Sequence, residues 1–135
     1  MEKKIRKRIR LENISNVYFM ETSEPEKYLG MGDVFVHPSL KEGFPNALME
    51  AMSAELASVG FEIGGVGDLI THAKTGFLAP RGNVESFSQH LFELIQNPEE
   101  TKAIGKAARN EMKRRFPFEG ITKKYFGLYQ KLVKK

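Results

Sequence analysis

Two glutamates, Glu42 and Glu50, bracket a short stretch of the sequence that could bind an anion. The residues between them are expected to begin a helix, and the first N–H groups of a helix have no partner inside it and attract a negatively charged oxygen. A carboxylate on each side of such a position can accept hydrogen bonds from sugar hydroxyls. These residue types therefore favour the binding of a phosphate with a sugar on each side, as in a nucleotide sugar. The N–H groups expected to point outward belong to Gly43, Phe44, Ala47 and Leu48.

A strand, a turn and a helix must hold this stretch in place. Asp33–His37 is rich in β-branched and aromatic residues, as strands are, and Pro38 prevents the strand from continuing in a ladder. A glycine and Pro45 favour a turn. Asn46 is a good N-cap, so we expect a helix from there to about residue 54, with Glu50 one turn into it.

The order of these features is more informative than the spacing of the two acids, because the same spacing recurs by chance at Glu85/Glu93 and Glu111/Glu119. The whole stretch His37–Met52 resembles the donor-site motif of retaining GT-B glycosyltransferases, in the glycosyl transferase group 1 family. The resemblance extends over roughly residues 16–132. Two later stretches that fit the family pattern are Gly64–Ile70 and Thr75–Leu78.

The resemblance implies a role for each residue of the motif. In the family, the acid at the position of Glu42 binds donor-sugar hydroxyls near the reacting carbon, which makes Glu42 the candidate catalytic residue. The acid at the position of Glu50 binds the ribose hydroxyls. The other donor-binding residues implied are Gly43, Phe44, Asn46, Ala47, Leu48, Gly64 and Gly65, the last two because bare backbone passes close to the ligand. Without a ligand, the two acids would be a helix cap and part of a solvated helix face.

The resemblance also implies a retaining sugar transfer from a nucleoside-diphosphate sugar, without a metal or other cofactor. The leaving phosphate would help to deprotonate the acceptor, and the protein would position the reactants and stabilise the departing charge. The residue pattern agrees, because the histidines are scattered and none has a second ligand at metal spacing. They are His37, His72 and His90.

The composition of the chain fits one globular domain. Its 135 residues, 41% of them hydrophobic and 28% charged, can bury a core. The sequence has no cysteine, no apolar run of membrane-spanning length and no signal-peptide core, so we expect a cytoplasmic location. The net charge of +4 suits an anionic partner, but we expect no nucleic acid because no motif for it is present.

The basic N-terminus, Met1–Arg10, has two interpretations. Its Lys and Arg residues, with Ile5 and Ile9 on one face, fit the solvated end of a helix. The second interpretation is peripheral contact with an anionic membrane, a property of many members of the resembled family.

Alternating strand and helix signals predict an α/β fold: a Rossmann-like parallel sheet flanked by helices, with a helical C-terminus. Ligands of such sheets bind beyond the carboxyl ends of the strands, where the motif lies. Further strands are expected at Val17–Met20, Leu56–Val59 and Gly76–Ala79, and helices at Glu26–Met31, Val66–Ile70, Val84–Ile95, Pro98–Arg115 and Ile121–Leu132, the last with its apolar stripe facing the core.

The resemblance implies that residues 1–135 are a single, partial C-terminal donor-binding domain. The acceptor domain and the first strand–helix units, with the cations that clamp the diphosphate, would be missing, and the sheet would lack a strand beside Asp33–His37. Either Val17–Met20 pairs there, or a second copy of the chain does so in a homodimer. Glu55 stands where the family has glycine, so the preceding helix could instead continue towards Val59 and remove that strand.

Three functions stay open from the sequence. The chain could supply the donor-binding part of a glycosyltransferase, bind a nucleotide sugar without catalysis, or be a non-binding remnant of the fold that assembles as a homo-oligomer. The motif favours the first function. The missing diphosphate clamp favours the other two for the chain in isolation.

Overall fold

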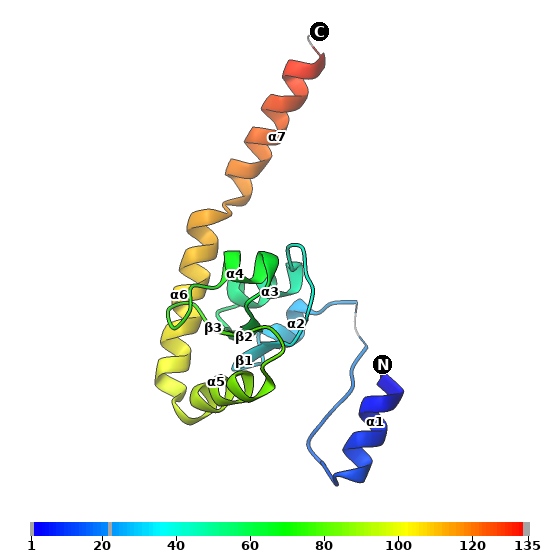
Figure 1. Cartoon of the computed structure of the whole chain (residues 1–135). Coiled ribbons are helices and arrows are strands. Elements are labelled where there is room, and N and C mark those ends of the chain that lie inside the picture. Colours follow the sequence, from blue (N-terminus) through cyan, green and yellow to red (C-terminus); the bar gives the residue numbers. More distant parts are fainter. Residues whose placement is uncertain (1, 22, 134–135) are drawn as a thin grey trace.

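The structure of the protein is a computed structural model that describes residues 2–21 and 23–133 (Figure 1). A small sheet with helices around it forms the body, and a helix extends from the body at each end of the chain. The elements are α1 (Glu2–Leu11), α2 (Glu26–Leu29), β1 (Val34–His37), α3 (Asn46–Ser53), β2 (Ala57–Phe61), α4 (Gly64–Leu69), β3 (Phe77–Ala79), α5 (Val84–Gln96), α6 (Pro98–Arg115) and α7 (Phe118–Val133).

The sheet confirms the predicted α/β class. Its strands are parallel and lie in the order β1-β2-β3, so β2 is central. Val34 of β1 lies opposite Ala57 of β2, and Val59 of β2 lies opposite Phe77 of β3. Every residue of β2 is buried, as expected for a parallel strand that is covered on both faces.

Two apolar clusters cover the two faces of the sheet, and α4 and α5 lie on opposite sides of it (Figure 1). One cluster joins alternate residues of β2 and β3 to α5 and the first half of α6: Ala57, Val59, Phe61, Phe77, Ala79, Phe87, Leu94 and Ile104. The other cluster joins α3, α4, the segment after α4 and the second half of α6: Leu48, Met52, Val66, Leu69, Ile70, Ala108 and Met112. Both helices α5 and α6 begin and end within one residue of their predicted bounds.

The predicted strand at Val17–Met20 is wrong. This segment pairs with no strand in the described chain, and its residues are exposed. Phe19 lies instead under Arg6 of α1, with 3.9 Å from the guanidinium carbon to the ring centre. A strand signal without a neighbouring ladder does not form a strand, because sheet propensity depends on packing. Among the described elements β1 pairs only with β2, so Val17–Met20 does not complete its outer edge.

Glu55 ends α3 in the conformation that glycine usually supplies. Its φ of 66° is left-handed, α3 ends at Ser53, and the strand predicted after it forms at Ala57–Phe61. The alternative, a helix that continues towards Val59, is therefore wrong. Arg109 on α6 donates a hydrogen bond to Glu55 Oε1 at 3.0 Å, which ties this turn to α6.

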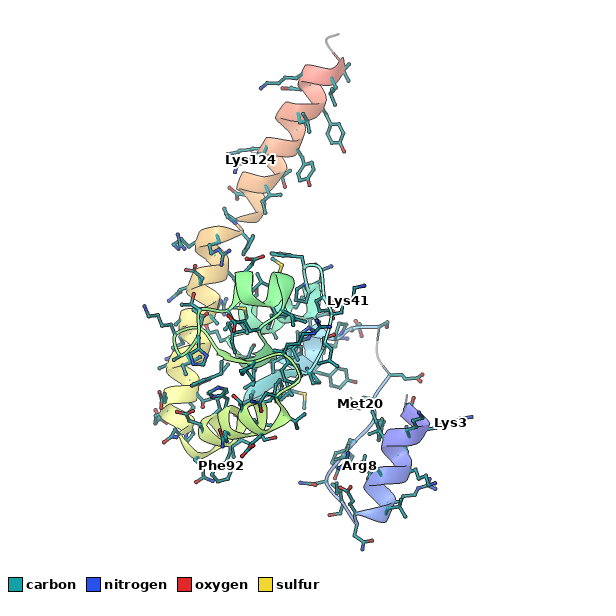
Figure 2. All side chains as sticks on the ribbon, viewed as in Figure 1. Lys3, Arg8, Met20, Lys41, Phe92 and Lys124 are labelled. Carbon is teal, nitrogen blue, oxygen red and sulfur yellow. The ribbon has the colours of Figure 1, made fainter. Side chains whose placement is uncertain are left out.

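The helices at the two ends of the chain lie outside the core. The apolar stripe of α7 was predicted to face the core, and that prediction is wrong: α7 projects from the body, and its described side chains are exposed or half-buried (Figures 1 and 2). Periodicity identifies an apolar face but not what covers it, and Pro117 separates α7 from α6. Over the described residues, no helix combines the length and apolarity needed to span a membrane.

Candidate functional site

Charged residues gather where the three strands end. Glu42 lies on the loop after β1, Glu62 follows β2 directly, and Arg81 comes two residues after β3. With Lys41, which lies on the same loop as Glu42 and is labelled in Figure 2, they line an open hollow of about 540 Å³. The other lining residues are Leu40, Ile63 and Gly64. The hollow is at the edge where open α/β sheets bind their ligands, and acids and cations both face it.

Glu42, the candidate catalytic residue, is fixed at one oxygen by the turn that follows β1. Ser39 Oγ donates a hydrogen bond to Glu42 Oε1 at 2.7 Å. His37 Nε2 lies 3.5 Å from the same oxygen. Since 32% of the Glu42 side chain is exposed, its carboxylate can also accept hydrogen bonds from ligand hydroxyls.

The start of α3 presents free backbone donors. Its N-cap is Pro45, which has no side-chain hydrogen bond to the helix, so the predicted capping by Asn46 is wrong. Pro45 takes the extended cap conformation, with φ −79° and ψ 108°, and Asn46 becomes the first helical residue. Met49 is the first to bond back, from its N–H to the Pro45 carbonyl at 3.3 Å. The N–H groups of Asn46, Ala47 and Leu48 therefore have no partner inside the helix and suit an anion.

The side chains of this first turn divide between core and solvent. Leu48 is fully buried, so only its N–H can serve a ligand, whereas Asn46 and Ala47 are exposed. Glu50 is also exposed and forms no ion pair within the described part of the chain. It does not line the hollow beside Glu42. The structure thus brings Glu42 and Gly64 together and leaves Glu50 one turn along α3.

The two glycines predicted for the site meet the Glu42 loop backbone to backbone. Gly64 has φ +27°, and a Cβ there would lie 2.7 Å from the carbonyl oxygen of Glu42. A Cβ on Gly65 would lie 2.1 Å from the carbonyl oxygen of Gly43, which accepts the N–H of Gly65 at 2.9 Å. These positions need glycine because the α4 backbone packs against the loop.

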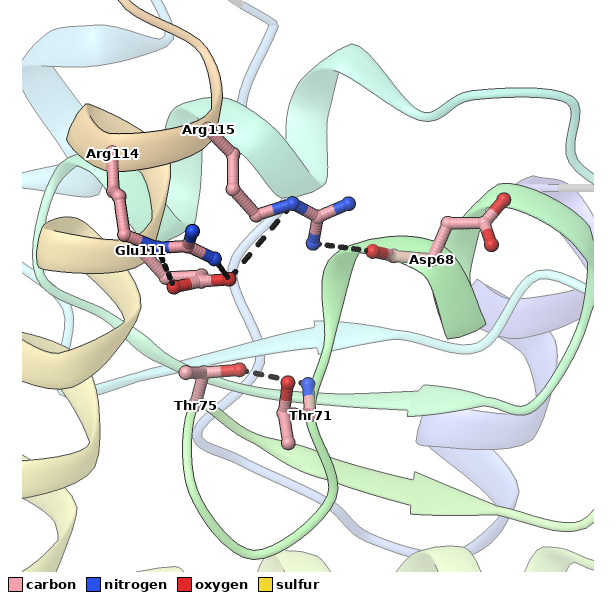
Figure 3. A network of polar contacts seen from close by, with 6 residues as sticks. All are labelled: Asp68, Thr71, Thr75, Glu111, Arg114 and Arg115. Atoms are coloured by element: carbon pink, nitrogen blue, oxygen red, sulfur yellow. Dashed lines mark hydrogen bonds and ion pairs between the residues drawn. The ribbon is translucent and has the colours of Figure 1, made fainter.

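A polar network ties the far end of α4 to α6 (Figure 3). Arg115 Nη1 donates to the carbonyl oxygen of Asp68 at 2.6 Å, and Arg115 Nε lies 3.8 Å from Glu111. Arg114 donates two hydrogen bonds to Glu111, at 3.0 and 2.7 Å, which lowers the pKa of that carboxyl group. The next residue, Phe116, packs edge-on against Phe44, with 5.7 Å between ring centres. The end of α6 therefore contacts both α4 and the loop between β1 and α3, which carries Glu42 and Phe44.

Sequence reasoning missed Glu62 and Arg81. The signal that could have found them is position: each comes within two residues of the carboxyl end of a strand. The remaining histidines, His72 and His90, contact one another with 5.2 Å between ring centres, whereas His37 lies beside Glu42. Among the described residues, no group of three or more His, Cys, Asp or Glu could hold a metal ion.

Comparisons with known proteins agree with this fold. The profile of the glycosyl transferases group 1 family matches residues 1–111. The amylovoran biosynthesis glycosyltransferase AmsK of Erwinia amylovora is 36% identical over 106 residues, which are 74% of this chain and 26% of that protein. The crystal structure of Anabaena HepE in complex with UDP-glucose has the same fold at 22% identity, with a TM-score of 0.88 over 96% of this chain and 36% of that chain.

A third match has the same fold and is the structure of a C-terminal domain alone. The crystal structure of the C-terminal domain of the glycosyl transferase group 1 protein LpcC from Francisella tularensis has a TM-score of 0.77 at 19% identity, over 87% of this chain and 63% of that chain. The chain therefore spans only part of each of these proteins. As its sequence resemblance predicts, it belongs to the glycosyl transferases group 1 family and corresponds to part of the C-terminal domain of GT-B enzymes.

Proposed function

We propose that this chain is the donor-binding part of a glycosyltransferase that moves a sugar, with retention, from a nucleoside-diphosphate sugar to an acceptor. The observation that carries the proposal is the Glu42 carboxylate, fixed at one oxygen and open to a hollow at the carboxyl ends of the strands. A relative of the same fold has been solved with UDP-glucose, which supports a donor of this class.

Each part of the site has a task in this proposal. Glu42 accepts hydrogen bonds from the donor sugar, and the N–H groups at the start of α3 face the phosphate together with the positive end of the helix dipole. Glu50 holds the ribose hydroxyls. Lys41 and Arg81 supply positive charge at the hollow. The transfer needs no metal or other cofactor, because the leaving diphosphate is stabilised by these groups.

The rest of the enzyme is part of the proposal too, because the chain spans only 26% of AmsK and 36% of HepE. The acceptor would bind to another part of a longer protein or to a companion chain. The second candidate is a module that binds a nucleotide sugar without catalysis. A turnover assay with an acceptor domain added in trans separates the two, since only the first gives product.

An amide NMR titration with UDP and then UDP-glucose tests the proposed site. We expect saturable shifts confined to residues 42–50 and 62–65 and to Arg81. The internal control is the exposed Ser88 on α5, whose amide should not move. No shift at millimolar ligand would refute donor binding.

We also propose that the outer edge of β1, which pairs with no other described strand, is completed by a second copy of the chain in a homodimer. Val36 on this strand is 40% exposed, and an unpaired parallel edge invites pairing. Light scattering after gel filtration should give twice the monomer mass, and Val36→Lys should restore the monomer. A wild-type monomer at micromolar concentration would refute the dimer.

We propose further that α1 makes peripheral contact with anionic membranes. Six of its ten residues are basic, and Ile5 and Leu11 are exposed at 46% and 72%. The protein should sediment with vesicles that contain phosphatidylserine, less so at high salt, and not with neutral vesicles. Equal sedimentation with both kinds of vesicle, or with neither, would refute this proposal.

A further inference from the structure

One buried group near the site has no partner. The Nε2 atom of His37 is buried and forms no hydrogen bond with any residue that the structure describes. It lies 3.5 Å from Glu42 Oε1, the oxygen that already accepts a hydrogen bond from Ser39 Oγ at 2.7 Å. Only 13% of the His37 side chain is exposed, so bulk water does not replace the missing partner. A buried polar atom without a partner is rare and calls for an explanation.

The hydrogen-bonding chemistry of His37, Ser39 and Glu42 gives an explanation. A carboxylate oxygen only accepts hydrogen bonds, so a bare Nε2 facing it would be repelled, whereas an Nε2–H can donate to it. As the Nε2–H tautomer, His37 presents a second donor to Oε1 beside the Ser39 hydroxyl. The other oxygen, Oε2, stays available to the hollow. The short turn His37–Glu42 brings all three side chains together.

We propose that His37 and Ser39 are positioning residues for Glu42. They hold Oε1 from two sides, so that Oε2 meets a hydroxyl of the donor sugar without rearrangement. If Glu42 binds the donor sugar, His37 and Ser39 contribute to recognition of the sugar and not of the nucleoside diphosphate. This consequence rests on the proposed function. The orientation of the Glu42 carboxylate by these two residues does not depend on a ligand and can be tested in the ligand-free protein.

The ligand-free property is tested by nitrogen-15 NMR of the imidazole ring. We expect the spectrum of neutral His37 to be that of the Nε2–H tautomer, and Glu42→Ala, which removes the acceptor, to change it. His72 is the internal control: its Nδ1 accepts the N–H of Leu78 at 3.1 Å, and its spectrum should be the same in both proteins. An Nδ1–H tautomer for His37, or a His37 signal that is the same in wild type and Glu42→Ala, overturns the inference whether or not a nucleotide binds.

The consequence for the donor is tested by calorimetry with UDP and UDP-glucose. Ser39→Ala should lower the preference for UDP-glucose over UDP by about threefold to tenfold, which corresponds to the net contribution of one ordinary hydrogen bond. The affinity for UDP itself should not change, Ser39→Thr should restore the preference, and Ser88→Ala should be neutral. UDP binding with an unaltered preference in Ser39→Ala overturns the inference. Failure of wild type to bind UDP overturns the proposed function instead, and the NMR result still decides whether Glu42 is held.

Discussion

Replacing Gly65 with alanine is expected to push α4 away from the loop that carries Glu42, Gly43 and Phe44. A Cβ at this position would lie 2.1 Å from the carbonyl oxygen of Gly43 and 2.9 Å from the Cα of Phe44. Real Cβ atoms essentially never come within 3.0 Å of other heavy atoms, and both neighbours are backbone atoms that cannot rotate away. The loop and α4 must therefore move apart, which also strains the hydrogen bond from the Gly65 N–H to the Gly43 carbonyl.

The size of the effect follows from three contributions. Overpacking costs about 1–3 kcal/mol, and a lost hydrogen bond costs about 0.5–1.5 kcal/mol. Alanine offsets about 0.5–1 kcal/mol of this because it favours a helix over glycine. The free energy of unfolding of Gly65→Ala should fall by roughly 1–3 kcal/mol, which corresponds to a Tm lower by about 4–12 °C. Urea denaturation followed by circular dichroism measures the change.

The matched control is Gly67→Ala on the same helix. A Cβ there meets only the Glu62 side chain, at 4.0 Å. The substitution should therefore leave the free energy of unfolding unchanged or raise it by up to about 1 kcal/mol. Equal stability of Gly65→Ala and Gly67→Ala would refute the argument that backbone contact, and not helix propensity, selects glycine at position 65.

Three further substitutions test other parts of the structure. Glu50→Ala should weaken UDP binding by about 1–3 kcal/mol in calorimetry, with the same urea midpoint, because the side chain is exposed and unpaired among the described residues. Glu55→Gly should raise the free energy of unfolding by up to about 1 kcal/mol, because relief of a left-handed glutamate that costs about 1–2 kcal/mol outweighs the loss of the exposed hydrogen bond with Arg109, worth about 0–1 kcal/mol; Glu55→Gln, which keeps the strain, should not. Arg115→Met should lower the Tm because it removes the hydrogen bond to the Asp68 carbonyl, worth about 1–2 kcal/mol, whereas Arg114→Met should leave the Tm close to that of wild type because Arg114 is exposed.

Local signals in the sequence were enough to predict most of the body. The strand at β1 follows from its β-branched and aromatic residues and from Pro38, and α5 and α6 follow from apolar periodicity and the Asn97-Pro98 break. The motif around Glu42 placed the loop and α3 correctly because it encodes strand, turn and helix in order. In each case, neighbouring residues carry the information.

The errors arise where a distant partner decides the outcome. Within the part of the chain that the structure describes, Val17–Met20 has strand composition but no ladder beside it, and the apolar face of α7 packs against no core. Glu55 takes the left-handed conformation despite its intrinsic cost, because β2 must begin next to it. These three outcomes cannot be derived from residues adjacent in sequence. The cap of α3 is a separate, local error of one residue, because Pro45 takes the cap position that Asn46 was predicted to hold.

The structure also separates what the motif contributes to the fold from what it leaves for a ligand. Gly64 and Gly65 are accounted for by backbone contact with the Glu42 loop, so their presence alone is no argument for a donor. Glu50 and Arg81 have no such structural task among the described residues. Arg81 lines the hollow at the carboxyl edge of the sheet, and Glu50 lies on α3, the helix that follows the Glu42 loop. Charges that stabilise nothing in the folded chain are the residues whose substitution should affect binding and leave stability unchanged. That division, glycines for the fold and charges for the ligand, is what the substitutions at positions 50 and 65 measure.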